Sequence, residues 1–270
     1  MKTLPLSVGI LTFNSARTLA RALESVKRCS DIIVCDGGSL DETLEIALRY
    51  GARVISQDTA YKRPDGSLKD YAGVRNQCLA AAREQWFLYI DSDESVSPEL
   101  IDELDRDVIR DTETAGYRIP ERFIVEGKMV EYASNYPGYQ YRVLRTGAGT
   151  RFVKPVHEQP PYFLPYAKLG TLDAPWYVYW DRNDIENYAK RNYKYLPLEV
   201  ERSRATGRWR YLTRFVPWHL RAIVAISCKS ILNRLLHPKS SHMPLSVEWS
   251  RIKYQVRLVL NTGSMIFSGK

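Results

Sequence analysis

Three acidic residues follow a short apolar run, Trp86-Phe87-Leu88-Tyr89-Ile90, and they are Asp91, Asp93 and Glu94. The run is too short for a helix and predicts a buried strand with negative charge at its end. In open α/β folds, ligands bind at the carboxyl ends of the strands. Carboxylate oxygens suit Mg²⁺ or Mn²⁺, which can neutralise a diphosphate. We therefore expect a metal and nucleotide-diphosphate site; the structural alternative is an acidic turn that caps a helix starting near Ser97.

The elements that must position these acids alternate between strand and helix over the first hundred residues. Residues 12–15 are expected to cap the first helix, Ser39 and Glu42 to form a capping box for the second, and Gly51 to end it. This alternation predicts an α/β fold with a mostly parallel sheet and right-handed crossovers. The expected strands are 6–11, 31–36, 52–55 and 86–90. Three helices are expected between them: one that ends near residue 30, one over about 39–50 and one over about 68–84.

The pattern changes after residue 116 to shorter aromatic and β-branched runs. A turn at 126–128 is expected to join two strands, 122–125 and 129–132, into a hairpin. Further strands are expected at 139–144 and 151–154, and a single polar helix at 183–205.

Polar side chains also follow the other parallel strands and are expected at the same edge of the sheet. They are Thr12 and Asn14 after the first strand, Asp36 after the second, and Arg75 on the helix before the fourth. A carboxylate can accept a hydrogen bond from the base or ribose of a nucleotide, and a guanidinium can contact phosphate oxygens. The structural alternative is that Thr12 and Asn14 only cap a helix and that Arg75 is a surface charge.

Four segments, 6–14, 32–43, 75–76 and 88–94, together resemble the nucleotide-binding half of family 2 glycosyltransferases with the GT-A fold. Residues 34–41 match the strand-acid-Gly-Ser segment of that family, and Asp91-Ser92-Asp93 matches its Asp-x-Asp motif. The chain is similar to bacterial enzymes that add sugars to lipopolysaccharide core, O-antigen or capsule precursors. It departs from many members at Gly37, where they have a second acid.

The resemblance implies transfer of a sugar from a nucleotide-diphosphate-sugar donor to a hydroxyl of a glycan or lipid-linked acceptor, with inversion. It implies that Mg²⁺ or Mn²⁺ is held by Asp93, Asp91 and His157 and stabilises the leaving diphosphate. It further implies donor contacts from a set of six residues, Thr12, Asn14, Asp36, Arg75, Asp91 and His157.

Inverting transfer needs a carboxylate base on the acceptor side, and Glu158 is the candidate. Asp70 and Glu94 are alternative bases. A structural alternative for His157 and Glu158 is a loop pair that contacts neighbouring Lys and Arg.

Charge is unevenly distributed along the 270 residues, whose net charge is +8. Residues 1–180 carry 22 Lys and Arg against 25 Asp and Glu, whereas residues 181–270 carry 17 against 6. We therefore expect a GT-A catalytic domain at 1–180, with a nucleotide-binding half at 1–95 and an acceptor half at 96–180, followed by a basic, aromatic-rich helical tail at 181–270.

The tail carries eleven Lys and Arg and a single acid from Arg208 onward, interleaved with Trp, Phe, Leu and Ile. This composition suits a helix that lies in the interface of an anionic membrane. The alternative is a helix that packs on the catalytic domain with a solvated basic face. Charges at Arg221 and Lys229 interrupt the apolar residues, so we do not expect a membrane-spanning segment.

The four cysteines show no Cys-x-x-Cys spacing, and Met1-Lys2 leads directly into a strand-like run without a signal-peptide pattern. We therefore expect a cytoplasmic protein, peripheral on the inner face of the cytoplasmic membrane. Competing functions are a nucleotide-sugar-binding pseudo-enzyme, a nucleotidyltransferase and a basic nucleic-acid-binding module. A nucleotidyltransferase would need a Gly-rich phosphate loop near the N-terminus. A nucleic-acid-binding module would place Asp36, Asp91 and Asp93 against the phosphates of the nucleic acid, so we expect no nucleic-acid partner.

Overall fold

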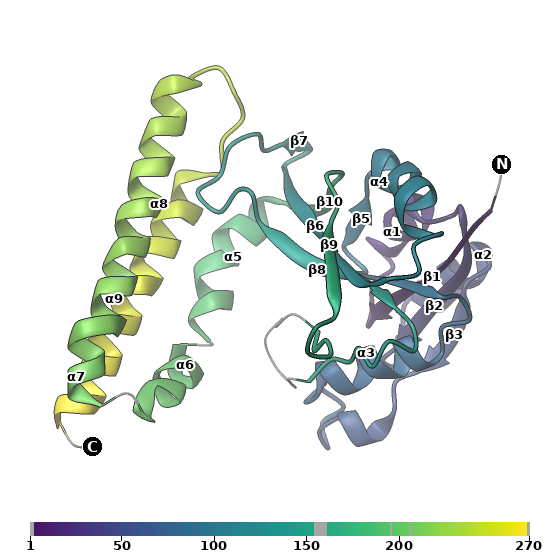
Figure 1. Ribbon diagram of the computed structural model, residues 1–270, viewed down its shortest axis with the longest axis horizontal. Coiled ribbons are helices and arrows are strands. Elements are labelled where there is room, and N and C mark those ends of the chain that lie inside the picture. Colours follow the sequence, from purple (N-terminus) through teal and green to yellow (C-terminus); the bar gives the residue numbers. More distant parts are fainter. Residues whose placement is uncertain (1–2, 154–160, 195, 206, 269–270) are drawn as a thin grey trace. The chain divides into compact units, whose positions relative to one another are not determined.

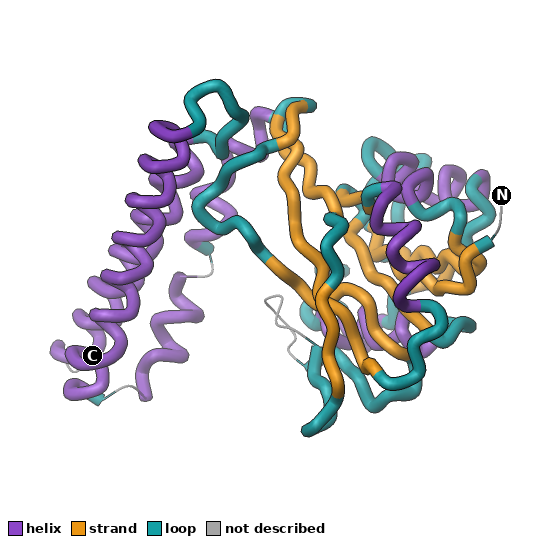
Figure 2. The backbone as a smooth tube through the Cα atoms, turned by 45° about the horizontal axis from the view of Figure 1, so that its top comes forward, coloured by secondary structure: helices purple, strands orange, loops and turns teal. Residues whose placement is uncertain are grey.

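The protein is described here by a computed structural model that covers residues 3–153, 161–194, 196–205 and 207–268 (Figure 1). The chain divides into two compact units. The first comprises Met1–Arg122 and Pro137–Val178, and the second comprises Phe123–Tyr136 and Tyr179–Lys270. A segment from the middle of the chain therefore belongs with the C-terminal residues. Strands dominate the first unit and long helices the second (Figure 2).

The described residues form a mixed sheet in the spatial order β3-β2-β1-β4-β8-β6-β10-β5. Strands β1 to β4 are parallel, β8 is antiparallel to both β4 and β6, and β9 is parallel to β6. The mostly parallel α/β half expected from the sequence is confirmed, and an antiparallel half continues it. The strands are β1 (Leu4–Thr12), β2 (Cys29–Asp36), β3 (Arg53–Ser56), β4 (Trp86–Asp91), β5 (Glu94–Val96), β6 (Thr114–Val125), β7 (Lys128–Met129), β8 (Tyr139–Arg145), β9 (Lys168–Thr171) and β10 (Trp176–Trp180).

Side-chain alternation along β4 divides the core of the first unit into two layers. Trp86, Leu88 and Ile90 pack into one cluster with α1 (Leu19–Ser25), α2 (Thr43–Arg49) and α4 (Pro98–Glu103), whereas Phe87 and Tyr89 pack into another with α3 (Tyr71–Ala80). Successive residues of a strand face opposite sides of its sheet, so a strand that is apolar throughout requires helices on both faces. This is the layered arrangement that the alternation of strands and helices predicted.

Several expected helix boundaries differ in the structure. The first helix begins only at Leu19, after a turn in which Asn14 has a positive φ of 50°. The capping box at Ser39 and Glu42 is wrong, because the Ser39 hydroxyl donates to Asp36 and α2 begins without a side-chain cap. Gly51 does follow α2 with φ 71°, as expected of a residue that ends a helix.

The hairpin in the second half is confirmed, with Glu126 and Gly127 both at positive φ between β6 and β7. Strand β8 also matches its expected range. The strand expected at 151–154 is wrong over its described part, since Arg151 forms only an isolated bridge with Tyr162.

The second unit contains α5 (Arg182–Tyr193), α6 (Leu196–Arg202), α7 (Arg208–Arg210), α8 (Val216–Leu236) and α9 (Leu245–Ser268). The single helix expected at 183–205 is two helices, and Pro197 lies in the first turn of α6, where its missing N–H costs little. A π-helical turn, Tyr211–Phe215, joins α7 to α8.

The resulting helix, Arg208–Leu236, is long and apolar enough to cross a membrane by length and composition alone, with 11% of its most apolar window buried. No spanning segment was expected, because Arg221 and Lys229 interrupt the apolar residues; the helix passes this test because an average over the window tolerates two charged residues.

Close packing of β1 against β4 gives a test of the core. A Cβ added at Gly9 would lie 2.5 Å from Cζ of the buried Phe87 and 3.2 Å from Cβ of Cys78. We expect Gly9→Ala to lower the free energy of unfolding by about 1–3 kcal/mol, as overpacking does in well-packed cores. Urea denaturation followed by circular dichroism measures this. Gly207→Ala is the control, because a Cβ there meets nothing within 4 Å; equal losses in the two variants would contradict the packing argument.

Candidate functional site at the carboxyl ends of β1, β2 and β4

The ends of β1 and β2 are joined through Asp36. Thr12 and Asp36 are register partners, and the Thr12 hydroxyl donates to Asp36 Oδ1 at 2.8 Å. The Ser39 hydroxyl donates to the same oxygen at 2.5 Å, and the amides of Gly38 and Ser39 donate to Oδ2 at 2.8 Å. Burial raises the pKa of Asp36, but these hydrogen bonds outweigh burial and hold the pKa below its ordinary value. A carboxylate offers about four acceptor positions, so a ligand that contacts Asp36 must replace one of these bonds.

Asn14 connects the loop after β1 to the loop after β2. The backbone amide of Asn14 donates to the Ser39 hydroxyl at 2.8 Å, and its side-chain oxygen accepts from the backbone amide of Leu40 at 2.9 Å. A cation that the sequence reasoning missed also reaches this loop, because Lys62 Nζ donates to the carbonyl of Gly37 at 2.6 Å. The loop therefore combines a fixed carboxylate with a neighbouring ammonium group.

Arg75 and Asp91 lie together at the end of β4. Arg75 Nη2 is 3.3 Å from Asp91 Oδ1, and its guanidinium lies 5.0 Å from the centre of the Tyr89 ring. Only 8% of Arg75 is exposed, so the alternative that it is a surface charge is wrong. Asp91 on β4 lies opposite Leu11 on β1, and Leu11 immediately precedes Thr12, the register partner of Asp36.

Asp93 lies in the turn after β4 with an exposed side chain. The turn is held by the backbone carbonyl of Asp93, which accepts from Arg21 at 3.1 Å, and by a 2.9 Å hydrogen bond between the hydroxyls of Ser92 and Ser15. The acids do not cap the next helix, because the Ser97 side chain accepts from the Leu100 amide at the start of α4. The structural alternative for the acidic turn is therefore wrong.

A buried ion pair that was not expected from the sequence holds the residue that follows this turn. Glu94 and Arg142 are both buried and form two hydrogen bonds of 2.9 and 3.0 Å. Glu94 also accepts from the indole N–H of Trp176 at 3.2 Å and from the amide of Asp91 at 2.9 Å. With both oxygens engaged, Glu94 is a poor candidate for the base. No local pattern indicates this pair, because Arg142 stands in a strand that also carries Gln140 and Arg145.

The structure thus brings together Thr12, Asn14 and Asp36 in one hydrogen-bonded group and Arg75 and Asp91 in a second. Asp70 caps α3 by accepting from the amide of Gly73 at 2.9 Å. His157 and Glu158 lie outside the described residues. Among the residues that are described, no three His, Cys, Asp or Glu side chains are grouped as metal ligands.

Comparison with known proteins identifies the family. The model of the family "Glycosyl transferase family 2" matches residues 7–157, more than half of the chain. The chain belongs to glycosyltransferase family 2. The match covers the ends of β1, β2 and β4 and the loops that follow them, and it agrees with the expected GT-A type of α/β fold.

Relatives are similar over different shares of their length. A TPR repeat-containing protein of Synechococcus elongatus is 31% identical over 56% of this chain, which covers 34% of that protein, so this chain spans about a third of it. The lipopolysaccharide core biosynthesis glycosyltransferase LpsC of Rhizobium meliloti is 23% identical over 76% of this chain and 74% of its own length. Among solved structures, glucosyl-3-phosphoglycerate synthase of Mycobacterium tuberculosis is 22% identical with a TM-score of 0.34 and covers 45% of this chain and 44% of its own.

The buried pair gives a test of what supports the acidic turn. We expect Glu94→Gln to lower the free energy of unfolding by about 3 kcal/mol, because it leaves the buried Arg142 without a full counter-charge. Guanidinium denaturation measures the loss. Glu186→Gln is the matched control, since its partner Arg182 is exposed and exposed pairs contribute little. A Glu94→Gln variant as stable as the control would show that the pair does not support the turn.

Proposed function

We propose that the protein transfers a sugar from a nucleotide-diphosphate-sugar donor to a hydroxyl of a glycan or lipid-linked acceptor, with inversion, in the synthesis of a bacterial surface polysaccharide. The observation that carries the proposal is that Asp36 and the Arg75–Asp91 ion pair lie at the carboxyl ends of β2 and β4, the two strands that flank β1, in a family 2 glycosyltransferase. The similarity to LpsC supports an acceptor of the lipopolysaccharide type.

The donor nucleotide is assigned to the ends of β1 and β2, where Thr12, Asn14 and Asp36 hold the two loops in place. Asp36 is ionised at neutral pH and can accept a hydrogen bond from the base or ribose in exchange for one of its internal hydrogen bonds. Arg75 is the group suited to the diphosphate, because its guanidinium is held at the sheet edge by Asp91 and two aromatic rings.

A divalent metal fits the donor set on chemical grounds. Asp91 and Asp93 offer carboxylate oxygens from one turn, and Mg²⁺ commonly binds one or two carboxylates together with substrate phosphates. Asp93 and Asp91 would hold the metal, and His157 is assigned as a third ligand from its sequence position. When bound, the metal supplies Lewis-acid stabilisation of the leaving diphosphate.

We assign Glu158 as the base that takes the proton of the acceptor hydroxyl. The assignment rests on the resemblance of the Val156-His157-Glu158 segment to the family and on the saturated contacts of the alternative, Glu94. We place the reaction at the inner face of the cytoplasmic membrane, where a lipid-linked acceptor and a soluble donor can meet.

Donor binding is tested by thermal shift with a panel of nucleoside diphosphates, in Mn²⁺, in Mg²⁺ and in chelator. A ligand at 100 times its Kd stabilises the folded state by about 2.7 kcal/mol, which raises Tm by several degrees. We expect a rise with one nucleotide that needs metal and is lost in Asp93→Asn. Asp107→Asn is the control, because Asp107 is paired with the neighbouring Arg106 at the surface. No rise with any nucleotide would contradict the assignment.

The base is tested separately with Glu158→Gln. We expect donor binding to be unchanged and transfer to fall by at least a factor of about 100, since general-base catalysis contributes roughly that much or more. Release of nucleoside diphosphate in the presence of acceptor measures the rate. Turnover equal to that of the unmodified protein would exclude Glu158 as the base.

A further inference from the structure

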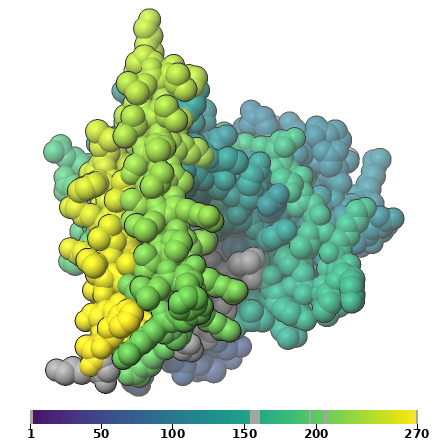
Figure 3. Space-filling model, turned by 60° about the vertical axis from the view of Figure 1, so that its left-hand side comes forward, coloured from purple at the N-terminus to yellow at the C-terminus, as the bar shows by residue number. Residues whose placement is uncertain are grey.

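Helix α8 carries an exposed apolar stripe along one face. We define the outer stripe as Trp218, Val224, Ala225, Cys228, Ile231, Leu232, Leu235 and Leu236, all of which are exposed. Their spacing of three, four and seven residues places them on one side of a helix, and from first to last they extend about 27 Å. Figure 3 shows α8 in light green at the front, with its outer side uncovered and α9 in yellow beside it.

The opposite side of α8 contains its buried polar groups. His219 and Ser230 are buried, and His219 Nδ1 lies 2.5 Å from Gln255 Oε1 on α9. Polar groups on the packed side and apolar groups on the exposed side are the reverse of a helix on a water-soluble surface. Exposed apolar patches of this extent mark surfaces that contact another molecule or a membrane.

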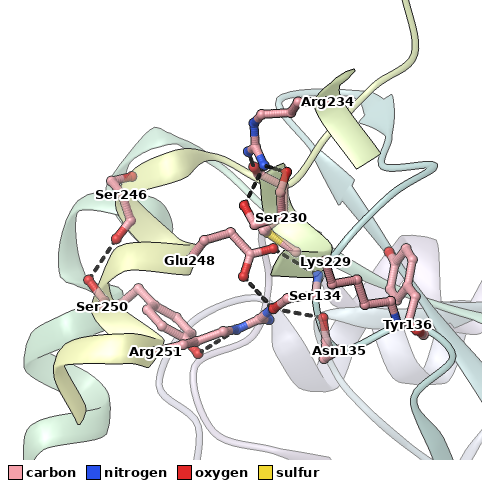
Figure 4. A network of polar contacts seen from close by, with 12 residues as sticks. Ser134, Asn135, Tyr136, Lys229, Ser230, Arg234, Ser246, Glu248, Ser250 and Arg251 are labelled. Atoms are coloured by element: carbon pink, nitrogen blue, oxygen red, sulfur yellow. Dashed lines mark hydrogen bonds and ion pairs between the residues drawn. The ribbon is translucent and has the colours of Figure 1, made fainter. Parts of the chain in front are cut away.

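Charge identifies the molecule that covers the stripe. From Arg208 onward the chain has eleven Lys and Arg, of which Arg214, Arg221 and Lys239 are exposed along or beside the stripe. The single acid, Glu248, is 2% exposed. Figure 4 shows Glu248 directed inward, where it accepts from the amide and hydroxyl of Ser134 and pairs with Arg251 at 3.4 Å. The exposed charge of this segment is therefore entirely positive.

We propose that the outer stripe of α8 docks the protein onto an anionic lipid bilayer, with α8 lying in the interface. Basic residues near an anionic surface and aliphatic residues buried at the headgroup boundary both favour this placement. A second copy of the chain would bring the same positive segment against itself. A spanning orientation would place Arg221 and Lys229 in the hydrocarbon, where such charges are costly. The inference rests on α8 and α9 and is independent of the proposed transfer chemistry.

Cys228 provides a direct test because it lies in the stripe and is exposed, whereas Cys29, Cys35 and Cys78 are buried. The full chain is labelled at Cys228 with a polarity-sensitive fluorophore and mixed with phosphatidylcholine vesicles with or without phosphatidylglycerol. We expect a blue shift of the emission with the anionic vesicles alone. A label at Leu48→Cys in a Cys228→Ser background is the control, because Leu48 is an exposed leucine on α2, and it should not shift.

Variants separate the apolar and electrostatic contributions in vesicle flotation. Leu235→Gln/Leu236→Gln should weaken binding by about tenfold or more, as expected when two leucines no longer enter the apolar part of the bilayer interface. Leu48→Gln/Leu198→Gln is the matched control, with exposed leucines on α2 and α6. Arg214→Glu/Arg221→Glu should weaken binding by about tenfold or more at low salt and by less at high salt.

Three results would overturn the proposal. The first is a labelled Cys228 that shows no shift with anionic vesicles. The second is a shift that depends on protein concentration without lipid and is lost in Leu235→Gln/Leu236→Gln, which would assign the stripe to a second copy. The third is membrane-bound protein that resists alkaline carbonate extraction, which would show that the Arg208–Leu236 helix spans the bilayer. Thermal shift with nucleotides on the same variants reports donor binding separately.

Discussion

The buried ion pair between Glu94 and Arg142 is the interaction on which the first unit depends. It joins the residue that follows the Asp-x-Asp turn to β8, and through the indole of Trp176 it also reaches β10. The parallel half and the antiparallel half of the sheet thus share one charged contact. Two desolvated charges are tolerated because every oxygen of Glu94 has a partner, including the amide of Asp91. The backbone at Asp91 is fixed as a consequence.

Much of the first unit could be predicted from the sequence because local patterns determine it. The continuous apolar runs that became β1, β2 and β4 require cover on both faces, and the helices between them supply it. The polar residues after each run lie at the carboxyl ends of the parallel strands, as expected, although they form two hydrogen-bonded groups. The positions of Thr12, Asp36, Arg75 and Asp91 at this edge of the sheet could therefore be predicted.

The features that could not be predicted from the sequence depend on partners distant in the chain. Ser39 has the spacing of a capping box, but its hydroxyl oxygen accepts from the backbone amide of Asn14, 25 residues away, and its proton goes to Asp36. Arg142 lies 48 residues from Glu94, so nothing local to either residue indicates the pair. The run at 151–154 resembles a strand, yet Arg151 has only the single bridge to Tyr162. The assignment of 123–136 to the second unit likewise follows from tertiary contacts, such as that of Ser134 with Glu248.

Burial distinguishes Asp36, Glu94 and Glu248 from Asp93. Asp36, Glu94 and Glu248 are buried, and each accepts several hydrogen bonds from its own unit. Such saturated carboxylates fix the backbone and hold their charge, but they have no acceptor position to give away without loss. Asp93 differs in its exposure: its side chain faces solvent, while its backbone carbonyl accepts from Arg21 and Ser92 in the same turn contacts Ser15. An exposed carboxylate on a fixed turn is compatible with the proposed metal, since Mg²⁺ keeps several of its waters and binds through one or two carboxylates together with substrate phosphates.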